Sequence, residues 1–204
     1  MAQVYAYDGV IPVIDPNAFV HPAAIVIGDV VVGPACYVGP GAVLRGDFGR
    51  IVLERGSNVQ ETCVVHSFPN LEVVIEEEGH IGHGAVLHGC RIGPNAMVGM
   101  NAVIMDEAVI GENSIVAAMA FVKAGAQIPA NSLAVGAPAR VVRELTPDEI
   151  AWKRQGTAIY QRLALEAKEK LVAVAPLTAP EPDRRRIRAP DYDPLILERL
   201  KLGD

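Results

Sequence analysis

Three histidines stand close together in the most regular part of the sequence. His83 and His88 lie five residues apart within the segment Gly79–Cys90, and His66 ends a short apolar run upstream. Three neutral imidazoles that leave one position open to water are the ligand set of a catalytic zinc-type site. Such a site activates water for attack on a carbonyl group or on carbon dioxide. These rings can act together only if the surrounding sequence folds so as to bring them to one place.

The surrounding sequence repeats with a period of six residues. A large aliphatic residue recurs at every sixth position, as at Ile92 and Val98, and a small residue follows four positions later, as at Ala96 and Ala102. This period fits neither an α-helix, which repeats every 3.6 residues, nor a plain strand, which repeats every two. It indicates short strands joined by tight corners, which is typical of a β-solenoid. We therefore predict an all-β solenoid with triangular coils of eighteen residues over residues 1–145.

The pattern changes after Leu145. Thr146–Glu149 reads Thr-Pro-Asp-Glu, a capping box with proline at the first helical position. Apolar residues at helical spacing follow, so we predict one amphipathic helix over 146–175 that lies along the flank of the solenoid. Residues 176–204 form a tail rich in proline and arginine.

The repeat places two of the histidines together. His66 and His88 each directly follow a periodic aliphatic residue and are 22 residues apart, which is one coil plus four. The non-repeating segment Ser67–Asn70 can bulge out, and the two rings then stack on adjacent coils, about 4.8 Å apart. His83 has a different phase and should project near another edge. A homotrimer that sets His83 of one chain beside His66 and His88 of the next would make three interfacial sites; otherwise these are solvated turn residues.

The other two histidines do not fit this geometry. We expect His21, which precedes Pro22, to be structural. We expect His80 to lie on the coil surface, with a supporting role near the metal as the alternative.

Composition narrows the classes of partner. The net charge of −6 argues against nucleic acid, and no apolar stretch approaches the 18 or so residues of a membrane helix. The beginning of the chain shows no export signal. Cys36, Cys63 and Cys90 have no paired spacing, so free thiols in the cytoplasm are expected. The first two fall at the small corner position, whereas Cys90 lies beside the histidines, where packing or metal binding is open.

The histidine trio, the Arg-Gly-Asp stretch in Leu44–Arg50 and the Asn-x-Gln of residues 58–60 resemble the γ-class carbonic anhydrase-like family. Its members are left-handed parallel β-helix homotrimers of the hexapeptide-repeat superfamily. The resemblance implies one divalent metal per subunit, zinc with iron or cobalt as alternatives, held by His66, His83 and His88. It also implies several supporting residues. Arg45 and Asp47 would form an intersubunit ion pair, and Gln60, which matches the family's Asn-x-Gln together with Asn58, would lie beside the metal-bound water. Glu61 stands where the family has Asp, and Tyr160 is similar to a tyrosine that the family brings near the site on its helix.

Within that family the sequence is most similar to thioesterases of phenylacetate breakdown and to proteins encoded with carnitine metabolism. The similarity implies a metal-dependent acyl-CoA thioesterase that hydrolyses ring-derived CoA thioesters, with Gln60, Glu61 and Tyr160 at the catalytic centre. Carbon dioxide hydration is one alternative, although the Ser67–Asn70 loop carries no acid to move protons. A CoA-dependent acyltransferase, which needs one histidine and no metal, is another, and a non-enzymatic metal-bearing scaffold is a third.

The tail contains the cluster Arg184-Arg-Arg-Ile-Arg188. Such a run is usually a solvated charged segment. Its alternative role is to bind the phosphates of coenzyme A through Arg184, Arg185 and Arg186.

Overall fold

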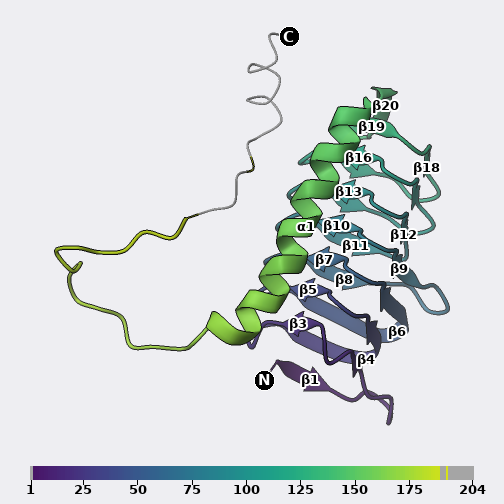
Figure 1. The fold of residues 1–204 in the computed structure, drawn as a ribbon. Coiled ribbons are helices and arrows are strands. Elements are labelled where there is room, and N and C mark those ends of the chain that lie inside the picture. The colour runs from purple at the N-terminus through teal and green to yellow at the C-terminus, as the bar shows by residue number, and fades with distance from the viewer. Residues whose placement is uncertain (1, 189–191, 193–204) are drawn as a thin grey trace, which may run out of the picture.

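The chain folds into a parallel β-solenoid of about 7 coils with one α-helix laid along it (Figure 1). The structure is a computed structural model that describes residues 2–188 and residue 192. The predicted fold class, a left-handed β-helix of hexapeptide repeats followed by a helix, is confirmed. The far end of the predicted tail, 176–204, lies outside the described residues.

Strands of successive coils pair in parallel and build three faces. The two arms of the larger sheet meet in β6 and form two faces, because β4 and β6 both run around a corner. This sheet contains β1 (Gln3–Tyr5), β2 (Val13–Ile14), β4 (Ile25–Val32), β6 (Val43–Leu53), β8 (Val64–His66), β9 (Val73–Ile75), β11 (Val86–His88), β12 (Arg91–Ile92), β14 (Val103–Ile104), β15 (Val109–Ile110), β17 (Phe121–Val122) and β18 (Gln127–Ile128).

The smaller sheet forms the third face. It contains β3 (Phe19–Val20), β5 (Tyr37–Val38), β7 (Asn58–Val59), β10 (His80–Ile81), β13 (Met97–Val98), β16 (Ile115–Val116), β19 (Ser132–Val135) and β20 (Arg140–Glu144). All its pairings are parallel except that of β19 with β20, which is antiparallel.

The period-six residues form the core. Ile92 and Val98 are fully buried, and so are the small residues Ala96 and Ala102 at the corners. Aliphatic side chains thus fill a narrow interior layer by layer, while a corner admits only a small side chain.

One set of corners is tied together by asparagine amides. Asn95, Asn113 and Asn131 follow at intervals of 18 residues and have φ angles of 51°, 59° and 56°. Asparagine tolerates this left-handed conformation better than most residues. Nδ2 of Asn95 donates to Oδ1 of Asn113 at 2.7 Å, and Nδ2 of Asn113 donates to Oδ1 of Asn131 at 2.8 Å. The three side chains form a ladder along one edge of the solenoid.

Helix α1 (Pro147–Lys170) begins at the predicted capping box. The Thr146 hydroxyl accepts from the Glu149 backbone N–H at 3.3 Å, and the Glu149 carboxylate accepts from the Thr146 N–H at 2.8 Å. The helix starts beside β20 and runs back toward β3, covering the smaller sheet (Figure 1). Its end at Lys170 comes five residues before the predicted limit. Among the described residues, no helix is long and apolar enough to cross a membrane.

Candidate functional site

His66 and His88 face each other on neighbouring strands. They are paired in register on β8 and β11, and the loop that contains Ser67–Asn70 absorbs the four extra residues, as predicted. Nδ1 of His66 lies 3.1 Å from Nε2 of His88. Two ligands of a tetrahedral metal with bonds of about 2.0–2.1 Å are separated by about 3.3 Å. The two nitrogens therefore stand close to the separation that a shared metal requires.

Each of these two rings has a carboxylate within hydrogen-bond distance of the nitrogen that does not face the other ring. Nε2 of His66 lies 3.0 Å from Oδ1 of Asp47, and Nδ1 of His88 lies 2.6 Å from Oδ1 of Asp106. Metal-binding histidines commonly donate their second ring N–H to a carboxylate, which fixes the tautomer and frees the other nitrogen to bind the metal. Burial lowers the pKa of His66, which favours the neutral imidazole that a metal needs.

Asp47 is ionised in this arrangement. Burial acts to raise its pKa, but hydrogen bonds from Arg45 and His66 outweigh burial, and the pKa lies below its usual range. We expected Arg45 and Asp47 to pair between subunits. In the structure, which contains one chain, Nη1 of Arg45 lies 2.6 Å from Oδ2 of Asp47, and pairing between subunits stays a prediction. The two residues are two positions apart on β6, where alternate side chains point to the same side of the strand.

His83 lies at a corner, in the turn between β10 of the smaller sheet and β11 of the larger sheet, as its phase predicted. Its Nδ1 is 2.5 Å from Oε2 of Glu61, and Oε1 of Glu61 accepts a hydrogen bond from the Tyr37 hydroxyl at 3.1 Å. Within the described part of one chain, no three His, Cys, Asp or Glu side chains form a group that could hold a metal. One chain thus supplies two converging imidazoles and a third that points elsewhere, each with its own carboxylate.

Among the described residues, His21 and His80 have no carboxylate partner. Nδ1 of His21 accepts from the backbone N–H of Ala23 at 3.0 Å in a turn, as expected of a structural residue. The expected position of His80 on the coil surface is wrong, because α1 covers it. Its Nε2 lies 2.7 Å from Nε2 of Gln60, and its Nδ1 lies 3.3 Å from the Thr157 hydroxyl on the helix. Burial lowers the pKa of His80 to about 3, so this ring stays neutral.

Three further predicted site residues gather around His80. Nδ2 of Asn58 is 3.2 Å from Nδ1 of His80, and Oδ1 of Asn58 accepts from Nε2 of Gln60 at 3.0 Å. The Tyr160 ring packs edge-on against His80 at 5.3 Å and against Tyr37 at 5.5 Å. Burial, followed by the charge of Glu61, raises the pKa of Tyr160 to about 12. Tyr160 is thus connected to His83 by way of Tyr37 and Glu61. A catalytic role for Asn58, Gln60 and Tyr160 stays a prediction.

Cys90 is buried, with an exposed fraction of 2%. Burial raises the pKa of its thiol to about 12, which disfavours the thiolate that a metal binds. The three cysteines, all free and buried, pack into the solenoid. Packing is therefore the role that the structure gives Cys90.

Two features of the site were not anticipated. Asp106 lies one 18-residue coil beyond His88, and its phase could have indicated that it would stand over that ring. Lys153 on α1 is buried, and its Nζ donates to the carbonyl of Glu78 at 2.7 Å and to Oδ1 of Asn95 at 2.8 Å. No pattern in the sequence predicts this contact, since it depends on which face the helix covers.

The described end of the tail lies across a cavity from the C-terminal half of α1. Arg184 pairs with Glu181 at 2.9 Å, whereas Arg185 and Arg186 line a cavity between the tail and the helix.

Comparison with known proteins identifies a matching family model and related sequences. The family model described as bacterial transferase hexapeptide (six repeats) matches residues 11–46 and 89–124. The carnitine operon protein CaiE of Proteus sp. (strain LE138) is 51% identical over 186 residues, covering 91% of this chain and 94% of that protein. CaiE of Salmonella newport (strain SL254) is 55% identical over 184 residues, covering 90% and 93%.

Two solved structures are similar at the level of fold and sequence. A Bacillus cereus protein to which acetyltransferase activity has been attributed has a TM-score of 0.81 and 34% identity, covering 82% of this chain and 97% of that one. A hexapeptide transferase family protein of Anaplasma phagocytophilum has a TM-score of 0.77 and 36% identity, covering 80% and 96%.

Proposed function

The chain belongs to the hexapeptide-repeat family, with the CaiE proteins among its relatives, and from this we propose that it is an enzyme that acts on coenzyme A thioesters. In our proposal it is a metal-dependent thioesterase, which transfers the acyl group to water. The metal is divalent, with zinc favoured and iron or cobalt as alternatives, and it is bound by His66, His83 and His88.

One observation carries this proposal. Each of these three histidines has its own carboxylate, at 3.0 Å for His66, 2.5 Å for His83 and 2.6 Å for His88. For His21 and His80, the partners in the described residues are backbone, amide and hydroxyl groups. Contact with a carboxylate therefore distinguishes the proposed metal ligands from the structural histidines. This distinction is independent of the sequence spacing and resemblance from which the ligands were predicted.

The third ligand requires a second copy of the chain. His83 lies in the turn between β10 and β11, and within the described part of one chain it forms no metal-binding group with the pair on β8 and β11. We propose a homotrimer in which His83 of one chain completes the site that His66 and His88 of the next chain begin. Three equivalent heterologous contacts close such a ring.

A divalent metal in this site supplies a Lewis acid and makes water a nucleophile near neutral pH. The chain's own residues do the rest. Asp47, Glu61 and Asp106 hold the imidazoles in the tautomers that present a lone pair to the metal. We propose that Glu61, which Tyr37 orients, accepts a proton at its carboxylate during turnover. The two N–H groups of the Gln60 amide are directed to Asn58 and His80, so we assign Gln60 the role of supporting His80.

Acyl transfer to an acceptor other than water is the second candidate. The matching family model is a transferase model, and two similar solved structures are described as an acetyltransferase and a hexapeptide transferase. These descriptions support group transfer to such an acceptor. The carboxylate-supported histidines favour water as the acceptor, since transfer to an amine or alcohol needs only one basic histidine.

The acyl group has two candidate classes. The sequence resemblance implies ring-derived CoA thioesters of phenylacetate breakdown, whereas the name of the CaiE relatives refers to a carnitine operon. Both classes belong in the assay, with a trimethylammonium acyl-CoA to represent the second. We place the reaction in the cytoplasm, where free cysteines such as Cys36, Cys63 and Cys90 persist.

The test combines metal content with turnover on three proteins: the native chain, His88→Ala, and His21→Ala as the matched control. We expect one metal per subunit and thioester hydrolysis in the native and His21→Ala proteins, and loss of both in His88→Ala. Carbon dioxide hydration and acyl transfer to amines are measured in parallel. Acyl transfer by a protein that neither binds metal nor loses activity in His88→Ala would refute the thioesterase proposal and leave the transferase.

A further inference from the structure

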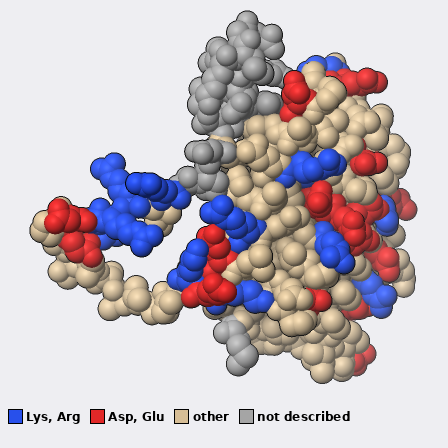
Figure 2. Space-filling view, in the orientation of Figure 1, with Lys and Arg blue, Asp and Glu red and all other residues tan. Residues whose placement is uncertain are grey.

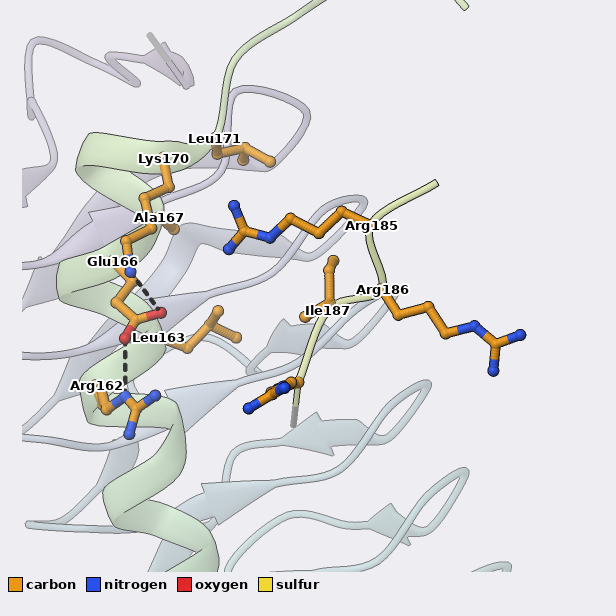
Figure 3. A pocket seen from close by; sticks show the side chains of 10 residues that line it. Arg162, Leu163, Glu166, Ala167, Lys170, Leu171, Arg185, Arg186 and Ile187 are labelled. Carbon is orange, nitrogen blue, oxygen red and sulfur yellow. Dashed lines mark hydrogen bonds and ion pairs between the residues drawn. The ribbon is translucent and has the colours of Figure 1, made fainter. Parts of the chain in front are cut away.

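The tail and the C-terminal half of α1 enclose an open cavity of about 1110 Å³ (Figure 3). We propose that this cavity binds the phosphorylated nucleotide end of coenzyme A, with Arg185 as the principal phosphate ligand. The inference rests on the proposed function for its substrate, but it concerns a separate site. The cavity is slightly larger than the roughly 300–1,000 Å³ typical of ligand pockets, which suits a large ligand.

The tail is held against the helix by a ring stack. It leaves α1 at Leu171 and returns so that Tyr192 stacks on Trp152, with ring centroids 5.3 Å apart and an interplanar angle of 18°. Gly156 makes room for this return, because a Cβ there would lie 2.6 Å from the Tyr192 hydroxyl. The tail is thus fixed to the helix at both ends of the segment that closes the cavity.

The cavity has a strong excess of positive charge in a protein whose net charge is −6. Five cationic side chains line it against one carboxylate, namely Arg162, Lys170, Arg185, Arg186 and Arg188 against Glu166. Glu166 is already paired with Arg162 at 2.8 Å and with Lys170 at 3.2 Å. Among the described residues, Arg185 and Arg188 have no ion pair, and Figure 2 shows the basic side chains of the tail gathered opposite the helix.

Figure 3 distinguishes the neighbouring arginines. The Arg185 side chain reaches toward the helix, whereas Arg186 points away from it. Arginine presents a planar fork that binds phosphate oxygens bidentately, so one inward guanidinium can anchor a phosphate. Arg185 is therefore the residue on which the proposal depends.

Apolar side chains complete the lining. Leu163, Leu171 and Ile187 have exposed fractions of 39%, 55% and 96%, and all three line the cavity. Inorganic phosphate would leave these surfaces in water. A ligand that carries phosphates together with a purine ring and an alkyl arm uses both parts of the lining, which favours coenzyme A over a simple anion.

The position of the cavity suits this ligand. Leu163 lies three residues along α1 from Tyr160, about 4.5 Å of helical rise. Tyr160 packs on Tyr37, whose hydroxyl donates to the Glu61 carboxylate beside His83. A nucleotide in the cavity thus lies close to the chain of contacts that leads to the third proposed ligand, and a flexible pantetheine arm can extend in that direction.

Calorimetric titration of the metal-free protein with coenzyme A tests the site independently of turnover. We expect Arg185→Ala to weaken binding on the order of tenfold, as loss of a charge-assisted hydrogen bond would. Arg184→Ala is the matched control, because it removes the same charge one residue away, from a side chain that is paired with Glu181 and does not line the cavity. Binding should also fall with salt and for dephospho-CoA.

A second variant and a kinetic ratio separate this site from the histidine site. Tyr192→Ala should weaken binding by releasing the tail, and the single tryptophan, Trp152, reports that release by fluorescence. In Arg185→Ala, kcat/KM for an acyl-CoA should fall relative to that for the N-acetylcysteamine thioester of the same acid. Equal CoA affinity in native protein, Arg185→Ala and Arg184→Ala, or no binding at all, would overturn the inference. Normal CoA binding without hydrolysis would instead refute the thioesterase proposal alone.

Discussion

Oδ1 of Asp106 lies 2.6 Å from Nδ1 of His88, one coil further along the solenoid. Because the coils repeat every 18 residues, a side chain that follows His88 by that interval stands directly over its ring. The opposite nitrogen, Nε2, faces His66 at 3.1 Å. Asp106 thereby determines which nitrogen of His88 is presented to the site.

Asp106→Asn tests this relationship. The amide keeps the size of the side chain but removes its charge, so we expect metal affinity to fall by about 10–100-fold. A titration against a chromophoric chelator measures the loss. Glu112→Gln, an exposed carboxylate elsewhere on the solenoid, is the control. If both variants bind metal as the native protein does, Asp106 does not support a ligand.

The proposed interfacial site predicts complementation between two inactive variants. His83→Ala and His88→Ala should each lack activity, because each removes one ligand from every site. When the two chains are mixed at random in trimers, about a quarter of the interfaces combine an intact His83 with an intact pair from the neighbour. We expect hydrolysis and bound metal to return toward that fraction after co-refolding. Recovery of neither would place all ligands of a working site within one chain, or deny the site altogether.

The sequence was sufficient for the solenoid because the repeat acts locally. A buried residue at every sixth position and a small one at each corner determine the coil, and parallel pairing then sets His66 opposite His88. The position of α1 depends instead on contacts between segments far apart in the chain, such as Lys153 with Asn95. No local pattern could therefore predict that the helix would cover His80.

The covered position of His80 predicts a loss of stability in acid. Its pKa is about 3 in the folded chain against an ordinary 6.5, so below pH 6.5 the unfolded state binds a proton that the folded state excludes. The free energy of unfolding should therefore fall as pH drops from about 6.5 toward 3, by up to about 1.4 kcal/mol per pH unit. His80→Gln should lack this contribution. Urea denaturation at pH 7 and pH 4.5 measures the difference, and His21→Gln controls for loss of a histidine outside the helix interface.

That prediction fails if native protein and His80→Gln lose the same stability between the two pH values. The metal content of the same variant is a second test, because His80→Gln should still bind one metal per subunit. Loss of the metal would show that His80 takes part in the site.

Lys153 predicts a slope of the same sign in base, where stability again rises with pH. Its Nζ is buried and donates to the Glu78 carbonyl and to Asn95, which begins the asparagine ladder. Burial lowers its pKa from 10.5 to about 7, with Arg154 acting in the same direction and Glu78 against it. The neutral amine keeps two N–H groups, enough for both acceptors, so deprotonation relieves the cost of a buried charge without breaking either hydrogen bond.

Between about pH 7 and 10 the unfolded state therefore holds a proton on Lys153 that the folded state has lost. The free energy of unfolding rises with pH wherever the unfolded state binds more protons, here by up to about 1.4 kcal/mol per pH unit. Relative to Lys153→Met, the native protein should gain stability between pH 7 and pH 9.5 in urea denaturation. Lys170→Met, which removes an exposed lysine paired with Glu166, should show no such gain. Parallel curves for the native protein and Lys153→Met would mean that Lys153 stays protonated under the helix, and that Glu78 and Asn95 stabilise an ammonium there.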